Sequence, residues 1–475
     1  MSDLTPTIFT IFGITGDLAS RKVLPALLSL YSKRLLPERF SIIGFSRRPF
    51  SREDFRELIR GKLNVRPGQF KEEEIKHFLD HISYEQGIFN EPLAYTRLSE
   101  RIHAIDDRWG QCTNKLFHLS VPPHLYEGIL TNLAGSRLTE SCADGVGWTR
   151  ILIEKPFGND IDTAKSLDKL LSKLFKEEQI FRIDHYLAKE ALQNILAFRA
   201  SNAIFESVWN KENIDKVHIK LYEKSGVEDR GAFYDKIGAL KDVGQNHILQ
   251  MLALIAMEHP RSFTPADVRR GRAETLERLM PIPERLVTKY VVRGQYDGYV
   301  NETGVAPDSA TETFFRIEAR LNTPRWKGVP FFLESGKAMS ESKTEIDVYF
   351  KQKAKKQKMM FFGRDSAPLG IEGQNVLTFR IQPDEGIKIR FFVKTPGYEF
   401  KTEPKILKFK YSDVPSFSAL PNDYERLLHD AFIGDQTLFA STDEIMASWK
   451  YVTPILAGLK KVLLKKYPQG IKEIE

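Results

Sequence analysis

Cysteine is scarce in this sequence. Only Cys112 and Cys142 occur among 475 residues. Two cysteines are too few for a disulfide framework or a thiolate metal site, so a reducing, cytoplasmic environment is expected.

Long apolar runs are also missing. The longest one extends from Met251 to Met257, far short of the roughly 18 residues that a membrane-spanning helix needs. The first residues, Met1-Ser2-Asp3, lack the basic region and apolar core of a secretory signal. The sequence therefore predicts neither a membrane span nor export.

The charge excess is small. Lysine and arginine number 70 against 63 acids, a net charge of +7, which favours anionic small ligands without indicating nucleic-acid binding. The one biased segment, 351–358, holds five lysines. No aromatic residues alternate with them for base stacking, so a solvated loop or exposed strand end is the preferred interpretation.

Several catalytic motifs are absent. The sequence contains no HExxH, no clustered Cys and His, no acidic calcium loop and no GxSxG. Metal-assisted hydrolysis and serine chemistry thus lose support, and we expect no metal. With 42% hydrophobic residues, the chain is long enough for real cores, and redox chemistry with a bound dinucleotide remains open.

The first part of the chain, residues 1–184, alternates strand and helix patterns. This alternation predicts a parallel sheet with right-handed crossovers, an α/β domain of the Rossmann type. Its predicted strands are Ile8–Phe12, Ser41–Phe45, Lys115–Val121, Arg150–Glu154 and Gln179–Asp184, and its predicted helices include Ala19–Leu36, Glu53–Leu63 and Leu125–Leu133.

Residues 185–475 show a different pattern. A long helix is predicted from Asp184 to about Ser201, and strands then follow in series, which predicts an α+β domain with a large, mainly antiparallel sheet. The strands are Lys216–Tyr222, Thr311–Arg320, Thr344–Phe350, Asn375–Gln382 and Ile387–Lys394, with helices at Tyr424–Ala431 and Thr442–Leu464.

A glycine-containing turn joins the first strand to the first helix. Its sequence is Gly13-Ile14-Thr15-Gly16-Asp17-Leu18, and glycines there let the backbone approach a pyrophosphate at the helix start. The spacing departs from GxGxxG, so a simple turn capped by Thr15 or Asp17 is the alternative.

The second strand bears on the choice of dinucleotide. It ends in Ser46-Arg47-Arg48 rather than in the acid that binds the ribose 2′-hydroxyl of NAD. Arginine forks suit the 2′-phosphate of NADP, whereas two solvated loop arginines are the alternative.

Two further motifs follow predicted strands. In Glu154-Lys155-Pro156-Phe157-Gly158, Pro156 restricts Lys155 and its bond is a candidate for the cis form. In Arg182-Ile183-Asp184-His185-Tyr186-Leu187-Ala188-Lys189, His185 and Lys189 are four apart on the predicted helix and converge on a phosphate with Tyr186. An exposed lysine turn and a structural polar network are the respective alternatives.

His247 occupies an apolar helical stripe with Leu240, Val243, Met251 and Leu254. A satisfied core histidine is the common explanation for such a position. A general base is the other, with Asp184 as a candidate partner for the second ring nitrogen.

Together these motifs resemble glucose-6-phosphate dehydrogenase. The resemblance continues through Asp242-Val243-x-Gln245-Asn246-His247, Arg325-Trp326-x-Gly328-Val329-Pro330-Phe331, Ser335-Gly336-Lys337 and Pro421-Asn422-x-Tyr424-Glu425-Arg426-Leu427, and spans nearly the whole chain. It implies oxidation of glucose 6-phosphate by NADP to 6-phosphogluconolactone, the first step of the pentose phosphate pathway.

The resemblance also implies roles for residues. His247 matches the general base and Asp184 its carboxylate partner, and Arg47 matches the 2′-phosphate contact. The groups matching the substrate phosphate are His185, Tyr186, Lys189 and Lys337, and those matching sugar contacts are Lys155, Glu223, Asp242 and Gln382, with Lys155 also near the nicotinamide.

Three positions depart from the family pattern. Ala188 replaces a glycine, Ser342 stands where many members have a cation, and Glu334 stands where the pocket for a second, structural NADP has arginine. We therefore expect no tight structural site. A homodimer or homotetramer is expected, because an uncovered sheet face would expose apolar area.

Two rival hypotheses remain at this point. One is a dehydrogenase for another phosphorylated aldose or for NAD, and the other is a non-catalytic dinucleotide-sensing protein that has kept the fold.

Overall fold

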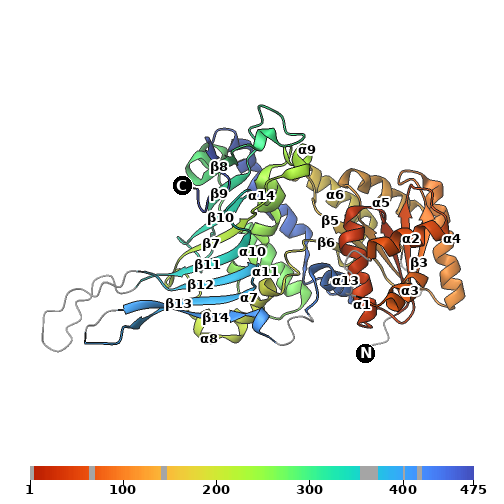
Figure 1. The fold of residues 1–475 in the computed structure, drawn as a ribbon, viewed down its shortest axis with the longest axis horizontal. Coiled ribbons are helices and arrows are strands. Elements are labelled where there is room, and N and C mark those ends of the chain that lie inside the picture. The colour runs from red at the N-terminus through yellow and green to blue at the C-terminus, as the bar shows by residue number, and fades with distance from the viewer. Residues whose placement is uncertain are drawn as a thin grey trace. The chain divides into compact units, whose positions relative to one another are not determined.

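The chain forms two compact units in the computed structural model (Figure 1). Unit 1 comprises Met1–Ala188, Ser262–Arg269 and Pro421–Met446, and unit 2 comprises Lys189–Arg261, Arg270–Leu420 and Ala447–Glu475. The structure describes residues 5–63, 70–140, 147–352, 373–398, 402–414 and 420–474. Most of the lysine-rich segment lies outside these ranges.

Unit 1 is built on a seven-stranded sheet in the order β15-β6-β5-β4-β1-β2-β3. Six strands are parallel and β15 joins β6 antiparallel. The strands are β1 Thr7–Phe12, β2 Phe40–Ser46, β3 Ile82–Gln86, β4 Asn114–Leu119, β5 Thr149–Glu154, β6 Ile180–Ile183 and β15 Phe439–Ala440. Because the chain moves outward from β1 to β3 and then returns to β4, the strand order reverses between β1 and β4, where open α/β sheets bind ligands.

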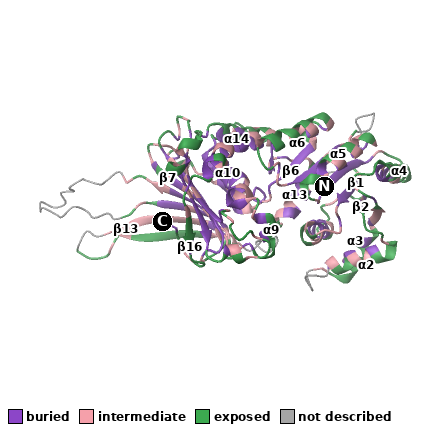
Figure 2. Ribbon diagram, turned by 90° about the horizontal axis from the view of Figure 1, so that it is seen from above, coloured by how far each residue is buried: buried purple, intermediate pink, exposed green. Residues whose placement is uncertain are grey.

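Helices cover both faces of this sheet (Figure 2). Every residue of β1 is buried, as expected for a central parallel strand covered on both sides. The helices of unit 1 are η1 Ala19–Val23, α1 Leu24–Ser32, α2 Arg52–Leu63, α3 Glu72–Asp80, α4 Pro92–Trp109, η2 Pro123–Leu125, α5 Tyr126–Gly135, α6 Ile161–Leu174, η3 Glu177–Gln179 and α13 Asp423–Ile433.

Unit 2 holds a nine-stranded sheet in the order β14-β13-β12-β11-β7-β10-β9-β8-β16. Only the β7–β10 and β8–β16 pairs are parallel. The strands are β7 Ile214–Tyr222, β8 Val291–Tyr296, β9 Phe314–Arg320, β10 Pro330–Gly336, β11 Lys343–Phe350, β12 Val376–Gln382, β13 Gly386–Lys394, β14 Thr402–Lys410 and β16 Leu464–Tyr467.

Helices α7 and η5 pack on one face of the unit 2 sheet. The remaining helices are α7 Glu190–Ser201, α8 Ala203–Glu206, η4 Glu228–Arg230, α9 Gly231–Tyr234, η5 Leu240–Ile248, α10 Leu249–Ala256, α11 Pro265–Glu277, η6 Glu284–Leu286, α12 Val287–Tyr290, η7 Tyr299–Asn301, η8 Tyr411–Asp413 and α14 Thr442–Leu459.

The other face of the unit 2 sheet is charged. His218 Nε2 lies 2.9 Å from a Glu334 oxygen, and Lys220 Nζ lies 3.3 Å from Asp347 Oδ2. These pairs lie on the central strands, whereas the edge strand β14 exposes Ile406, Leu407 and Phe409. The expectation that an uncovered face favours an oligomer stays a prediction.

The sequence patterns located most elements but missed several. The expected fold class is confirmed, and each predicted strand is present within a few residues. The sequence patterns missed the strands β3, β8, β10, β14, β15 and β16. Most of these strands are short or lie at or near a sheet edge, and β10 is flanked by proline and glycine. The domain boundary between residues 184 and 185 stays a prediction.

Candidate functional site

The predicted phosphate-binding turn leads from β1 to η1. Gly13 has a φ of +80°, and a Cβ there would lie 2.4 Å from the Ser120 carbonyl oxygen, so only glycine fits. The Gly16 amide donates to the Gly13 carbonyl over 2.8 Å. The helix begins at Asp17 and continues into η1. The described residues show no hydrogen bond from a backbone amide of its first turn to the Thr15 or Asp17 side chain, and the first-turn amides suit an anion.

A cavity of about 520 Å³ lies in unit 1 at the carboxyl ends of β1, β2, β3 and β4. Among the described residues that line it none is acidic, and the exposed Arg47 and Arg48 lie beside the turn residue Thr15. The lining residues are Gly13, Thr15, Gly16, Ser46, Arg47, Arg48, Ile88, Phe89, Asn90, Ser120, Val121, Pro122, His124 and Leu125. Its place in the sheet and its positive charge suit the phosphates of a dinucleotide.

Sequence reasoning missed half of this lining. Residues 88–90 follow β3 and residues 120–125 follow β4. The strand β3 was not predicted, so the first set had no signal. The second set follows a predicted strand, and the rule that ligands bind at the carboxyl ends of parallel strands would have found it.

Lys155 directly follows β5. The Lys155–Pro156 bond is cis, as the motif suggested. Glu154, the last residue of the strand, is 8% exposed. The lysine is thus placed at the same sheet edge as the dinucleotide cavity, at the end of a buried strand.

Asp184, His185 and Tyr186 follow β6 in turns rather than in a helix. Leu187 N donates to Asp184 O over 3.0 Å, and Asp184 Oδ1 accepts a bond from Tyr186 N over 3.1 Å. The prediction that His185 and Lys189 share one helical face is wrong, because the Asp184 side chain offers the backbone an alternative to helix. The helix α7 begins only at Glu190, and Lys189 is its N-cap residue.

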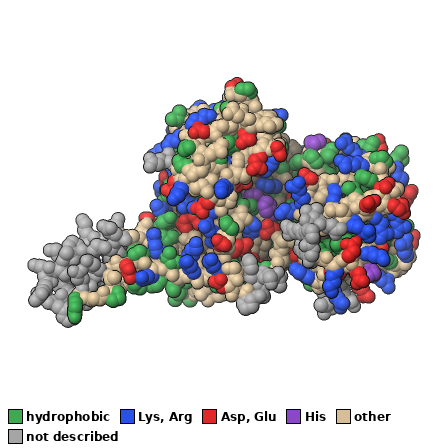
Figure 3. Space-filling model, viewed as in Figure 1, with side chains coloured by type: hydrophobic (Ala, Val, Ile, Leu, Met, Phe, Trp, Pro, Cys, Tyr) green, Lys and Arg blue, Asp and Glu red, His purple; other side chains and the backbone are tan. Residues whose placement is uncertain are grey.

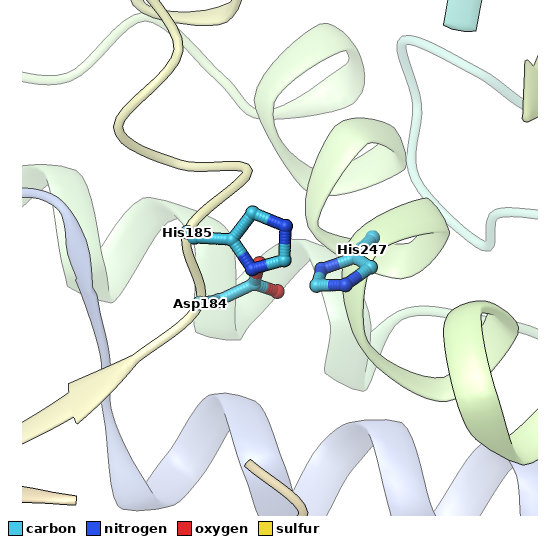
Figure 4. A group of neighbouring side chains, drawn as sticks. All are labelled: Asp184, His185 and His247. Carbon is cyan, nitrogen blue, oxygen red and sulfur yellow. The ribbon is translucent and has the colours of Figure 1, made fainter. Parts of the chain in front are cut away.

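Figure 4 draws the side chains of Asp184 and His185 beyond β6 and that of His247 on η5. Asp184 is 2% exposed and belongs to unit 1, whereas His247 is 1% exposed and belongs to unit 2. Their pairing as a carboxylate and a general base stays a prediction.

Within unit 2, parallel pairing of β7 and β10 brings Glu223 and Lys337 together. Each residue directly follows its strand, Glu223 N donates to Gly336 O over 2.9 Å, and the two side chains form an ion pair. The Lys337 ammonium also lies 5.2 Å from the centre of the Tyr234 ring. Tyr234, which sequence reasoning missed, had no signal beyond its aromatic type.

Asp242 and His247 belong to η5, which is wound as a π-helix rather than as the expected α-helix. This winding shifts the predicted stripe, and Val243 is only partly buried. Such turns are rare and frequent at functional sites. Gln382 ends β12 and is only partly buried.

A buried glutamate supports the start of η5. Glu312 Oε1 accepts a bond from Leu240 N over 3.1 Å, while Glu312 O accepts one from Ala239 N over 3.0 Å. Gly238, with a φ of +74°, has no Cβ to meet the carboxylate. Burial raises the pKa of Glu312 to about 7.

The fold and these sites define an oxidoreductase class: a Rossmann-type unit with a phosphate-binding turn, and a second unit with convergent cationic and acidic side chains. Two family models cover nearly all of the chain, the glucose-6-phosphate dehydrogenase NAD binding domain over residues 10–194 and the glucose-6-phosphate dehydrogenase C-terminal domain over residues 196–474. The chain belongs to the glucose-6-phosphate dehydrogenase family.

Relatives and solved structures agree with this assignment. Glucose-6-phosphate 1-dehydrogenase of Chlamydia muridarum is 38% identical, covering 99% of this chain and 95% of the relative, and that of Bacillus subtilis is 37% identical, covering 98% and 94%. A solved glucose-6-phosphate dehydrogenase in complex with its substrate glucose 6-phosphate matches with a TM-score of 0.89 at 34% identity, covering 100% of this chain and 97% of that one.

Proposed function

We propose that this chain oxidises D-glucose 6-phosphate with NADP to 6-phospho-D-glucono-1,5-lactone, the first step of the pentose phosphate pathway. The single observation that carries the proposal is the family match over the full chain, with a relative solved in complex with glucose 6-phosphate. The charged groups at the ends of β7 and β10 and the dinucleotide cavity of unit 1 agree with it.

The cofactor supplies a nicotinamide ring that accepts the hydride from C1 of the sugar. Among this chain's residues, the first-turn amides of η1 and the glycines of the turn suit the pyrophosphate. Arg47 and Arg48 at the end of β2 suit a 2′-phosphate, and among the described residues that line the cavity no acid is present to bind the 2′-hydroxyl of NAD instead. These features support NADP as the preferred dinucleotide.

Loss of the hydride from C1 requires loss of the proton from O1. His247 is the proposed general base, because an imidazole titrates near neutrality. Asp184 is proposed to stabilise the imidazolium that forms. His247 is buried on the π-helix η5. A buried residue whose only role is packing is more often a leucine than a histidine.

The substrate phosphate is assigned to His185, Tyr186, Lys189 and Lys337. Of these, Lys337 already lies against Glu223, a proposed sugar ligand. An ammonium that is ion-paired at the end of one strand and bounded by an aromatic ring is restricted in position, so it binds a phosphate with less loss of side-chain entropy. Lys155, Asp242 and Gln382 complete the proposed sugar contacts.

A homodimer or homotetramer is proposed for the whole protein, and light scattering after gel filtration tests it. Among the described residues, no helix has the length and apolar character needed to span a bilayer. We propose a cytoplasmic location, in keeping with the low cysteine content of the chain. The charged groups on the face drawn in Figure 3 are of both signs and intermixed, which agrees with the absence of a nucleic-acid partner.

The test is the initial rate of absorbance increase at 340 nm, with glucose 6-phosphate as sole sugar and with NADP or NAD. The expected result is rapid NADPH formation and a higher kcat/KM with NADP than with NAD. Mannose 6-phosphate and galactose 6-phosphate serve as matched sugars, and a higher kcat/KM with either would assign another phosphorylated aldose. No turnover with any pair would favour a dinucleotide-sensing protein.

A further inference from the structure

Two residues to which the proposed reaction assigns no role meet inside unit 1. Glu154, the last residue of β5, and Tyr424, in the first turn of α13, are 270 residues apart in sequence. The Tyr424 hydroxyl donates to the Glu154 carboxylate, at 3.1 Å from Oε1 and 3.2 Å from Oε2. Both residues are buried, so this contact is shielded from water.

A third side chain completes the carboxylate's surroundings. His118 Nε2, from the neighbouring strand β4, lies 3.0 Å from Glu154 Oε1. The backbone carbonyl of Glu154 accepts a further bond from the Tyr126 hydroxyl over 3.0 Å. Side chain and backbone of Glu154 are thus both fixed by donors from other elements.

The charge state of the tyrosine agrees with this arrangement. Burial, together with the Glu154 charge and the hydrogen bond, raises the pKa of Tyr424 well above its usual range. Tyr424 is therefore protonated and a hydrogen-bond donor at neutral pH. Without that donor, the buried carboxylate would lose part of its solvation, and buried charges move or recruit water to recover it.

We propose that Tyr424 and Glu154 form a positioning pair that holds Lys155 at the place where it meets the sugar. Lys155 is bonded directly to Glu154, so any shift of the carboxylate that moves the end of β5 also moves the lysine. The inference rests on the proposed role of Lys155 in substrate binding. A displacement of about 1 Å costs rate when reacting groups must be aligned.

The neighbouring residue on α13 offers a matched control. Glu425 accepts a bond from Ser29 Oγ of α1 over 2.9 Å and forms an ion pair with Lys33, the C-cap residue of α1. It is buried like Tyr424 and lies in the same helical turn, and its side chain bonds to Ser29 and Lys33 rather than to Glu154. If Tyr424 acted only by stabilising α13, changing Glu425 should therefore have the same effect as changing Tyr424.

The experiment is a double-mutant cycle in the full-length enzyme. Tyr424→Phe removes one hydroxyl and is expected to lower kcat/KM for glucose 6-phosphate about tenfold. In a Lys155→Ala background, the same substitution is expected to change kcat/KM less than twofold, because the residue that it positions is gone. Glu425→Gln is expected to lower the melting temperature while kcat/KM per folded active site stays within twofold.

The outcomes are distinct. An equal loss of kcat/KM from Tyr424→Phe in the parent and in the Lys155→Ala background would overturn the positioning pair. So would a loss of kcat/KM from Glu425→Gln as large as that from Tyr424→Phe, and α13 would then be a stabilising helix only. If Tyr424→Phe does not fold, Glu154→Gln is run through the same cycle with the same criterion. A parent enzyme that does not turn over glucose 6-phosphate would overturn the proposed function itself, whereas an active parent with additive losses overturns this inference alone.

Discussion

The dinucleotide cavity of unit 1 and the charged cluster of unit 2 are assembled in different ways. The cavity draws all its lining residues from positions 13–125, where each set directly follows a successive parallel strand. The cluster instead joins Glu223 and Lys337, which are 114 residues apart, through the parallel pairing of β7 with β10. The turn and the arginines of the cavity can be recognised from local motifs, whereas the contact between Glu223 and Lys337 depends on long-range strand pairing.

The two regions also differ in electrostatics. The unit 1 cavity presents exposed arginines and helix amides to an anion, with few buried charges. Unit 2 holds buried glutamates whose pKa values move in opposite directions. Burial raises the pKa of Glu312. Burial acts the same way on Glu334, but His218, Tyr222 and Arg316 together outweigh it and lower the pKa of Glu334. Chemistry that depends on proton transfer is thus expected to reside on the unit 2 side.

The sharpest test of that division is His247→Asn. Removing a general base costs about 10²–10⁴ in rate, so kcat should fall by that factor with KM little changed. Asp184→Asn should also lower kcat. In the double variant, the fold decrease in kcat should be clearly smaller than the product of the two single decreases. The measurement is kcat per folded active site together with the melting temperature.

His259→Asn is the control, since His259 is exposed just beyond α10, and it should leave kcat unchanged. Near-normal turnover in a destabilised His247→Asn protein would make His247 a core residue.

Lys189→Ala tests the phosphate assignment. Losing a charge-assisted hydrogen bond costs about 1.5–3 kcal/mol, so kcat/KM for glucose 6-phosphate should fall by about a hundredfold. Unphosphorylated glucose, a poor substrate, should be affected far less. Steady-state rates with both sugars provide the comparison, and Lys289→Ala, an exposed lysine of α12, provides the control. Equal losses with both sugars would give Lys189 a structural or catalytic role.

Arg47→Ala removes one of the two arginines that line the unit 1 cavity. The KM for NADP should rise by roughly one to two decades, while that for NAD stays nearly unchanged, because only NADP carries the 2′-phosphate. Arg39→Ala is a matched control, since Arg39 is exposed and precedes the opposite end of the same strand. If both cofactors lost affinity alike, Arg47 would not select between them.

The smallest expected effect concerns stability. Glu312 has a pKa of about 7 when folded and 4.5 as its ordinary value. Between these values the unfolded chain loses a proton that the folded protein keeps, so the free energy of unfolding falls as pH rises. The variant Glu312→Gln lacks this titrating group. The difference in free energy of unfolding between the variant and the parent should therefore shift in favour of the variant by about 2 kcal/mol from pH 5 to pH 8.

Glu334→Gln is the counterpart. The lowered pKa of Glu334 places its titration below its ordinary value of 4.5, so the titration of Glu334 itself should add almost no change in stability between pH 5 and pH 8. Denaturant melts at the two pH values measure both variants. A pH-independent difference for Glu312→Gln would show that Glu312 is ionised in the folded protein.

Particular residues show where prediction from sequence succeeded. The strand and turn at Thr7–Gly16 were recognised because a buried apolar run, a glycine and an amphipathic helix are all local signals. The helix predicted after Asp184 began too early, because no propensity reveals that the Asp184 side chain bonds the Tyr186 amide. The π-winding of η5 was equally invisible, since it depends on how the helix packs and on the tertiary cap from Glu312.

The sequence by itself determined the fold class, the family and the phosphate-binding turn, because these depend on periodicity and on residues adjacent along the chain. Tertiary structure alone decided that α13 joins the Rossmann-type unit, that Tyr424 reaches Glu154, and that Glu223 meets Lys337. Those contacts join residues more than a hundred positions apart. Their energy depends on burial and on which partners the packed strands bring within hydrogen-bonding distance, and neither is encoded by a local pattern.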